Sequence, residues 1–178
     1  VRGFLLATSV LEGLSAPLCD AVAARSDGQA MLERIDRENL FVVALDDERR
    51  WYRYHHLFAD FLRSRLGREG ARRVADLHLR ASSWYEEHGQ IVEAIGHALS
   101  APDHEHAARL IEREVKQAWS RGEGPTVLGW LEALPADVKR RRPRLLLQHA
   151  QARALTGRPD EAAPLVQEAE RAADAAGA

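Results

Sequence analysis

Apolar residues recur with a helical period through most of this chain, separated by glycine, proline and capping residues. Three short helices are expected near the N-terminus, the first ending near Gly13. Ser15 and Asp27 are residue types that favour the N-cap position and start the second and third helices. Pro17 is tolerated in a first turn, and Asn39 is placed to end the third helix. The apolar residues that indicate these three helices are Leu5, Leu6 and Val10, then Leu18 and Val22, then Met31, Leu32 and Ile35.

The period changes between residues 40 and 54. Residues 40–45 form a short β-like run, residues 46–49 a polar turn, and residues 50–54 an aromatic second strand. A hairpin of two strands is marginal alone, so it must pack on the helices. A 3.6-residue period then resumes at Leu57, Phe58, Phe61, Leu62 and Leu66. Three helices, a hairpin and a closing helix predict a winged-helix domain over residues 1–67.

The remaining residues, 68–178, are expected to form α-helical hairpins. Gly89, Gly122 and Gly157 are turn positions separated by 33 and 35 residues. The pattern Gly-x-x-x-Glu-Ala occurs at Gly89 and again at Gly157, a separation of 68 or twice 34, which is the tetratricopeptide period. Asp103 is expected to cap one of these helices. The predicted fold class is therefore mainly all-α, a winged helix with a small β-hairpin followed by tetratricopeptide-like hairpins.

Composition narrows the range of functions. A net charge of −2 gives no global electrostatic case for nucleic acid or an anionic membrane. No apolar run approaches the ~18 residues that span a bilayer, so no membrane partner is expected. Cys19 is the single cysteine, expected as a small core residue beside Leu18 and Val22, and a reducing cytoplasm fits it better than a disulfide framework. We interpret the chain as a segment excised from a larger protein.

No catalytic or metal site is predicted. The sequence lacks a Gly-x-x-x-x-Gly-Lys-[Ser/Thr] loop for a nucleoside triphosphate and a His-Glu-x-x-His zinc motif. His104 and His106 are two positions apart, so on a helix their imidazoles diverge. The segment is therefore expected not to be an enzyme, and its own cofactors to be none.

Two charged segments bear on DNA binding. The third helix and the polar turn are neutral to acidic, which argues against duplex binding by the winged helix. The dense basic run Lys139–Arg144 has two interpretations, an anion or nucleic-acid patch and a solvated loop whose Pro143 starts the next helix. The loop is the favoured interpretation.

The string YRYHHLFADFL at residues 52–62, with FLLATSVL at residues 4–11, closely resembles the MalT-like, LuxR-type transcription regulators, which belong to the STAND class of ATPases. The resemblance extends through Trp84-Tyr85 and through WLEALP at residues 130–135. It implies a nucleotide-binding domain upstream, then a winged helix, helical sensor repeats and a C-terminal helix-turn-helix. DNA would be bound only by that C-terminal domain, which this segment lacks.

The resemblance also implies a site residue. Relatives carry a Met-His-Asp motif whose histidine contacts the β-phosphate of ADP and holds the resting state. Tyr54-His55-His56-Leu57 aligns with Met-His-Asp-Leu, which places His55 at the phosphate-sensing position and puts His56 in place of the aspartate. A helix N-terminus bearing an imidazole is a reasonable anion site. The alternative is that His55 only caps the helix or packs against Tyr52.

These implications predict a regulatory segment of an ATP-dependent transcriptional activator. The winged helix would lock an ADP-bound upstream domain, and the repeats would relay binding of an inducer or regulatory protein. The full-length protein would exchange ADP for ATP and self-associate. The alternatives are a plain tetratricopeptide-like scaffold for protein binding and an unrecognised enzyme.

Overall fold

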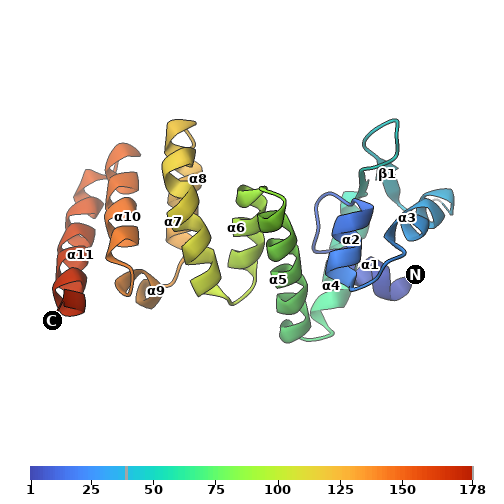
Figure 1. Ribbon diagram of the computed structural model, residues 1–178, viewed down its shortest axis with the longest axis horizontal. Coiled ribbons are helices and arrows are strands. Elements are labelled where there is room, and N and C mark those ends of the chain that lie inside the picture. The colour runs from blue at the N-terminus through green and yellow to red at the C-terminus, as the bar shows by residue number, and fades with distance from the viewer. Residues whose placement is uncertain (39, 178) are drawn as a thin grey trace. The chain divides into compact units, whose positions relative to one another are not determined.

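The computed structural model describes residues 1–38 and 40–177 and confirms a mainly helical fold with one small hairpin (Figure 1). The chain divides into two compact units, of which the first is Val1–Gln90 and the second begins at Ile91. No helix of the described residues is both long and apolar enough to cross a lipid bilayer. The first unit contains α1 (Arg2–Thr8), α2 (Ala16–Ala23), α3 (Gly28–Arg37), β1 (Val42–Ala44), β2 (Tyr52–Tyr54), α4 (His56–Gly67) and α5 (Ala71–Glu87). The second contains α6 (Ile91–Ser100), α7 (His104–Ser120), α8 (Gly124–Ala133), α9 (Ala136–Arg140), α10 (Pro143–Leu155), the 3₁₀ turn η1 (Pro159–Glu161) and α11 (Ala162–Gly177).

The first helix is shorter than predicted, because α1 ends at Thr8 rather than near Gly13. The Thr8 hydroxyl donates to the Phe4 carbonyl at 2.8 Å, and the Ser9 hydroxyl donates to the Leu6 carbonyl at 2.8 Å. These side chains satisfy carbonyls of the last turn, so the helix can end in the buried interior. The chain then runs to Leu14, whose backbone exchanges two 2.8 Å hydrogen bonds with Tyr52.

The capping of α3 differs from the prediction. Asp27 is the N-cap residue, but its carboxylate pairs with Arg25 at 2.6 Å instead of capping the helix. Asp20 takes that role, since its carboxylate accepts a hydrogen bond from the Gly28 backbone N–H at 2.8 Å. A Cβ at Gly28 would lie 2.8 Å from the same oxygen, so this close approach requires glycine. The expected end of the helix at Asn39 lies outside the described residues.

The hairpin is antiparallel and shorter than predicted. Its register pairs Val42 with Tyr54 and Ala44 with Tyr52, and the Leu45 N–H extends the pairing to the Trp51 carbonyl at 2.8 Å. The side chain of Asp46 accepts a hydrogen bond from the Arg50 N–H at 2.7 Å and closes the turn. The tyrosines of β2 are both buried, so this strand anchors the hairpin to the helices.

Helix α4 follows the predicted period, but its apolar residues divide between two sides. Ala59, Leu62 and Leu66 are buried against the rest of the first unit. Leu57 and Phe61 face solvent, with 67% and 53% of their surface exposed. Successive residues of an α-helix are about 100° apart, so Leu57 and Phe61 lie on the side away from the three buried residues. The apolar stripe of α4 is therefore wider than its own unit covers.

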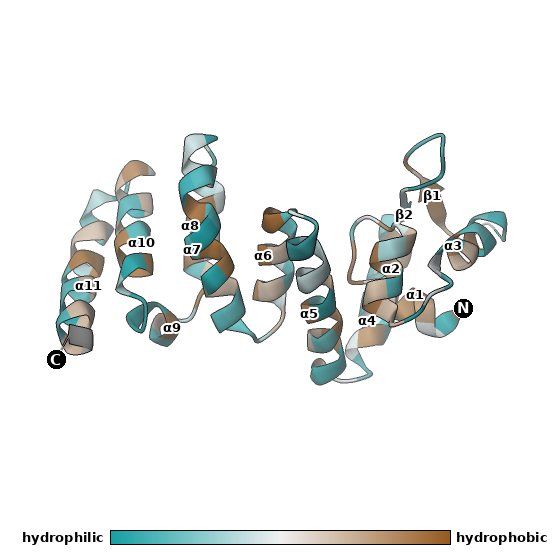
Figure 2. Ribbon diagram, viewed as in Figure 1, coloured by the Kyte–Doolittle hydropathy of each residue, from teal (hydrophilic) through white to brown (hydrophobic). Residues whose placement is uncertain are grey.

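In the second unit α7 packs against α6 and α8, and α10 packs against α11. Hydrophobic and hydrophilic segments alternate along α7, as an amphipathic helix requires (Figure 2). The prediction that Asp103 caps α7 is confirmed, since its carboxylate accepts from the His106 N–H at 3.1 Å. Gly122 and Gly157 have φ of 77° and 86° where helices end, which confirms them as turn positions. The tetratricopeptide-like assignment itself stays a prediction.

Candidate functional site

His55 lies where β2 passes into α4, and backbone hydrogen bonds fix it there. Its N–H donates to the Phe41 carbonyl at 2.7 Å, which joins it to the start of β1. Its carbonyl accepts from the N–H groups of Phe58 at 2.9 Å and Ala59 at 3.0 Å, which makes it the N-cap residue of α4. The position of the His55 backbone is therefore set by both the hairpin and the helix.

A buried hydrogen bond anchors the residue before it. The hydroxyls of Tyr54 and Thr8 lie 2.7 Å apart. The Thr8 hydroxyl already donates its proton to the Phe4 carbonyl, so Tyr54 is the donor in this bond. Burial raises the pKa of the Tyr54 hydroxyl, which keeps it protonated for that role. Strand β2 is thus tied to α1 immediately before the candidate site.

The side chain of His55 is exposed and makes no capping hydrogen bond. Its ring lies 4.4 Å from the ring of His56, which is also exposed. The first turn of α4 carries no acidic residue, so nothing there neutralises the partial positive charge of the helix N-terminus. The predicted site residue is therefore not sealed in the interior of its own unit, and the site presents two imidazoles and a helix N-terminus to a ligand.

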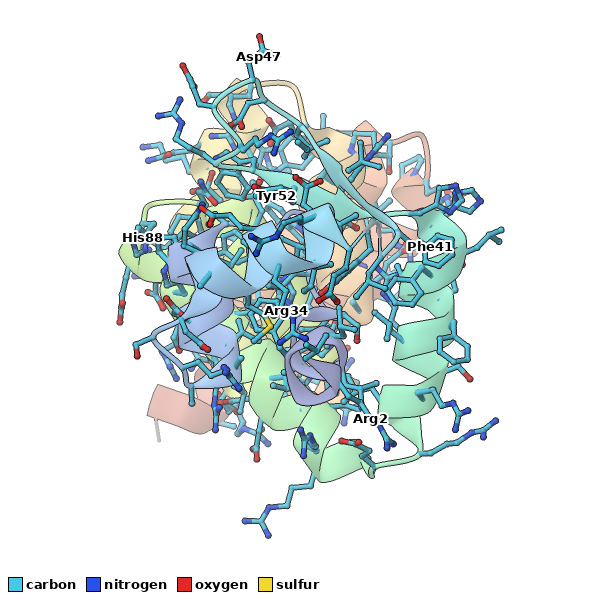
Figure 3. The ribbon with its side chains drawn as sticks, turned by 90° about the vertical axis from the view of Figure 1, so that its right-hand side faces the viewer. Arg2, Arg34, Phe41, Asp47, Tyr52 and His88 are labelled. Carbon is cyan, nitrogen blue, oxygen red and sulfur yellow. The ribbon has the colours of Figure 1, made fainter. Side chains whose placement is uncertain are left out.

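Next to His55 is an apolar surface that the sequence did not identify as functional, formed by Phe41, Leu57, Phe58 and Phe61 and named here the aromatic surface. Phe41 is 61% exposed and its ring lies 5.3 Å from the ring of Phe58. Phe58 is followed by Phe61, whose nearly parallel ring is 6.4 Å away. Figure 3 shows Phe41 beside the N-terminal part of α4. The sequence did contain a signal for this surface, because the apolar residues of α4 form a stripe wider than one buried side of the helix needs.

Phe41 also has a strained backbone. Its φ is +55°, in the left-handed region that bulky residues rarely adopt. Such a conformation costs about 1–3 kcal/mol and persists only where the surroundings enforce it. Here the carbonyl of Phe41 accepts the hydrogen bond from His55. The strain is therefore located at the contact that positions the candidate residue.

The basic run Lys139–Arg144 is not entirely a loop, because Lys139 and Arg140 form the end of α9, and its arginines pair with carboxylates of neighbouring helices. Arg141 and Arg142 both bind the carboxylate of Glu105 on α7, at 2.7 Å and 3.1 Å. Arg140 binds Glu168 on α11 at 2.7 Å, and the buried Lys139 ammonium donates to the Leu131 carbonyl at 2.8 Å. Pro143 does start the next helix, as expected. Arg140, Arg141 and Arg142 therefore join neighbouring helices of the second unit, although the side chains of Arg140 and Arg141 stay 59% and 58% exposed.

Other candidate chemistry is structural. Cys19 is fully buried, and burial, with a smaller contribution from Asp20, raises the pKa of its thiol to about 12, which confirms it as a core residue. His149 is also buried, and burial, followed by the charges of Lys139 and Arg153, lowers its pKa to about 4. Within the part of the chain that the structure describes, no group of three or more histidine, cysteine or carboxylate side chains is placed to hold a metal ion.

Comparison with known proteins agrees with the fold and the resemblance. Residues 1–74 match the family described as the MalT winged helix domain. The serine/threonine-protein kinase PknK of Mycobacterium tuberculosis is 40% identical over 159 residues, which cover 89% of this chain and 14% of that kinase. The HTH-type transcriptional regulator MalT of Klebsiella pneumoniae is 37% identical over 153 residues, which cover 84% of this chain and 16% of that regulator. The chain thus spans only 14% to 16% of the length of these relatives.

Proposed function

We propose, from the premise that residues 1–74 belong to the MalT winged helix family, that this chain is the regulatory segment of an ATP-dependent, cytoplasmic transcriptional activator. In this proposal the first unit docks on a nucleotide-binding domain upstream, and His55 binds a phosphate of ADP. The helical hairpins of residues 68–178 relay the binding of an inducer or regulatory protein. The full-length protein self-associates after ATP replaces ADP and binds DNA through a separate C-terminal domain.

One observation carries the proposal. His55 holds a fixed backbone position between the hairpin and α4, yet its side chain is exposed and makes no capping hydrogen bond. An imidazole beside an unneutralised helix N-terminus is suited to bind an anionic group. A histidine that served only to cap α4 or to pack against Tyr52 would not need that exposure.

The two relatives support a role that does not depend on the activity of the rest of the protein. One is named a protein kinase and the other a transcriptional regulator, yet the match to each covers more than four fifths of the present chain. A segment shared by proteins with different activities is better explained as a control element than as the part that carries the activity. The transcriptional output is proposed here because the family match is to the MalT domain.

The proposal is tested in the full-length protein by His55→Ala. Loss of a phosphate contact destabilises the resting state, so transcription is expected to proceed without inducer. His88→Ala is the matched control, because His88 is exposed on the same unit and contacts only its helix neighbour Trp84: the ring centres are 3.8 Å apart, and His88 Nδ1 lies 2.7 Å from the Trp84 carbonyl oxygen. Inducer dependence that is unchanged by His55→Ala would refute the proposed role of His55.

A further inference from the structure

An open groove lies between α1 and α4, continuous with the aromatic surface. It has a volume of about 470 Å³. Leu5 and Leu6 of α1 line one side, and Phe58, Phe61 and Leu62 of α4 line the other. Phe58 and Phe61 belong to both features, so the apolar area runs from Phe41 along α4 into the groove. Contiguous exposed apolar residues on a folded domain are a feature of interaction sites.

The rim of the groove is positively charged. Its lining includes Arg2 and Arg65 and no acidic residue. The Arg65 guanidinium lies 5.4 Å from the centre of the Phe61 ring, which holds it over the apolar floor. The nearest carboxylate in the α4 sequence, that of Asp60, pairs with Arg63 at 3.1 Å. Among the described residues no ion pair is recorded for Arg2 or Arg65, so both are available to a partner.

We propose that this groove binds an amphipathic helix on a separate regulatory protein, with apolar residues in the groove and carboxylates on the two arginines. The apolar floor accepts side chains spaced one helical turn apart, as in other helix-in-groove complexes. The positive rim selects acidic residues on the flanks of that helix. Figure 3 shows Arg2 at the opposite end of α4 from Phe41, so charge and apolar contacts extend along the whole helix.

The shape of the surface favours a protein segment over a small molecule. Leu57 and Phe41 lie outside the groove lining yet are 67% and 61% exposed on its continuation. The stretch from Leu57 to Arg65 rises about 12 Å along the axis of α4, roughly two helical turns. A small ligand in the groove would leave the aromatic surface uncovered, whereas a docked helix would cover both.

The test uses a fluorescent peptide of about 14 residues, designed as a helix with leucines one turn apart and glutamates on the flanks. Fluorescence anisotropy measures its binding to the 178-residue chain. Phe61→Ser is expected to weaken binding about tenfold, because Phe61 is a central apolar anchor. Leu155→Ser is the matched control, since Leu155 is 65% exposed in the second unit. Thermal melts monitored by circular dichroism establish that both variants are folded.

A charge exchange gives a second readout. Replacing Arg2 and Arg65 by glutamate is expected to weaken binding of the glutamate peptide. The same replacement is expected to strengthen binding of a peptide that has lysines in place of the glutamates. Equal binding of the two peptides to the unaltered chain, or no effect of Phe61→Ser, would overturn the proposal. Exclusion of the glutamate peptide by the full-length protein would also overturn it, because the groove would then belong to another domain of the same protein. His55→Ala is expected to leave peptide binding unchanged, because His55 does not line the groove, so this test is independent of the proposed nucleotide contact.

Discussion

The buried hydroxyl pair of Thr8 and Tyr54 allows a quantitative test of how the candidate site is held. Tyr54→Phe removes one hydrogen bond, but the Thr8 hydroxyl keeps its own bond to the Phe4 carbonyl. A typical buried hydrogen bond contributes about 1 kcal/mol net, so the free energy of unfolding is expected to fall by about that amount. No polar group is left without a partner in this variant.

Thr8→Val is expected to cost more, because it removes the acceptor and leaves the Tyr54 hydroxyl buried alone. Thr8 is fully buried and Tyr54 is 6% exposed, so water cannot replace the lost partner. An unsatisfied buried donor costs about 1–3 kcal/mol. The double variant removes both groups and is expected to cost less than the sum of the single variants, with a coupling of about 1 kcal/mol.

Urea unfolding followed by circular dichroism and tryptophan fluorescence measures these differences in the free energy of unfolding. Thr156→Val is the matched control, because the Thr156 hydroxyl donates to the Ala152 carbonyl one turn back at 2.7 Å, as Thr8 does to Phe4. Combined with Tyr54→Phe, this control is expected to be additive. Additivity of Thr8→Val with Tyr54→Phe as well would refute the claim that the two hydroxyls are bonded.

Three further predictions concern stability. Asp20→Ala is expected to lower the free energy of unfolding by about 1 kcal/mol and Asp27→Ala to lower it much less, because only Asp20 caps α3; urea unfolding distinguishes them, and equal effects would contradict this assignment. Gly124→Ala is expected to cost about 1–3 kcal/mol in the same assay, since its Cβ would lie 2.8 Å from the Trp119 ring, and a neutral effect would contradict the packing. Burial lowers the pKa of His149 to about 4, so the unfolded chain takes up a proton near pH 6.5 while the folded chain does not. Stability is therefore expected to fall as pH drops from 6.5 toward 4, by up to about 3 kcal/mol, and His149→Gln should flatten this decline between pH 7.5 and 4.5 in urea titrations; an equally steep decline in that variant would contradict the role of His149.

Much of the architecture follows from local pattern. The helices of the second unit other than α9, the hairpin and the Asp103 cap depend on residues close in sequence, and their signals were sufficient. The short helix α9 was not anticipated, because five residues hold little more than one turn and show no period. The early end of α1 was also missed, since it depends on hydroxyl groups that bond to carbonyls instead of continuing the helix.

Features that depend on distant partners could not be predicted. Asp20 and Asp27 have the same side chain, and only the fold decides which reaches the Gly28 N–H. Arg142 is 37 residues from Glu105, so the pairing of the basic run required the packing of α7. The location of His55 followed from the sequence by resemblance, and the structure adds its exposure.

The position of the boundary between the two predicted domains stays a prediction. The sequence pattern put it after residue 67, and the family match extends to residue 74. The compact units divide after Gln90, so α5 is grouped with the winged helix. A polar hydrogen bond from the Arg80 guanidinium to the Val22 carbonyl at 3.2 Å joins α5 to α2, which explains this grouping physically.

The rate at which ADP leaves the full-length protein tests the proposed role of His55 most directly. A charge-assisted hydrogen bond contributes about 1.5–3 kcal/mol, so His55→Ala is expected to speed ADP release about ten- to hundredfold, while His88→Ala leaves it unchanged. If the ADP release rates of the unaltered protein and both variants differ by less than about twofold, the lost interaction is weaker than such a bond, and the account is contradicted.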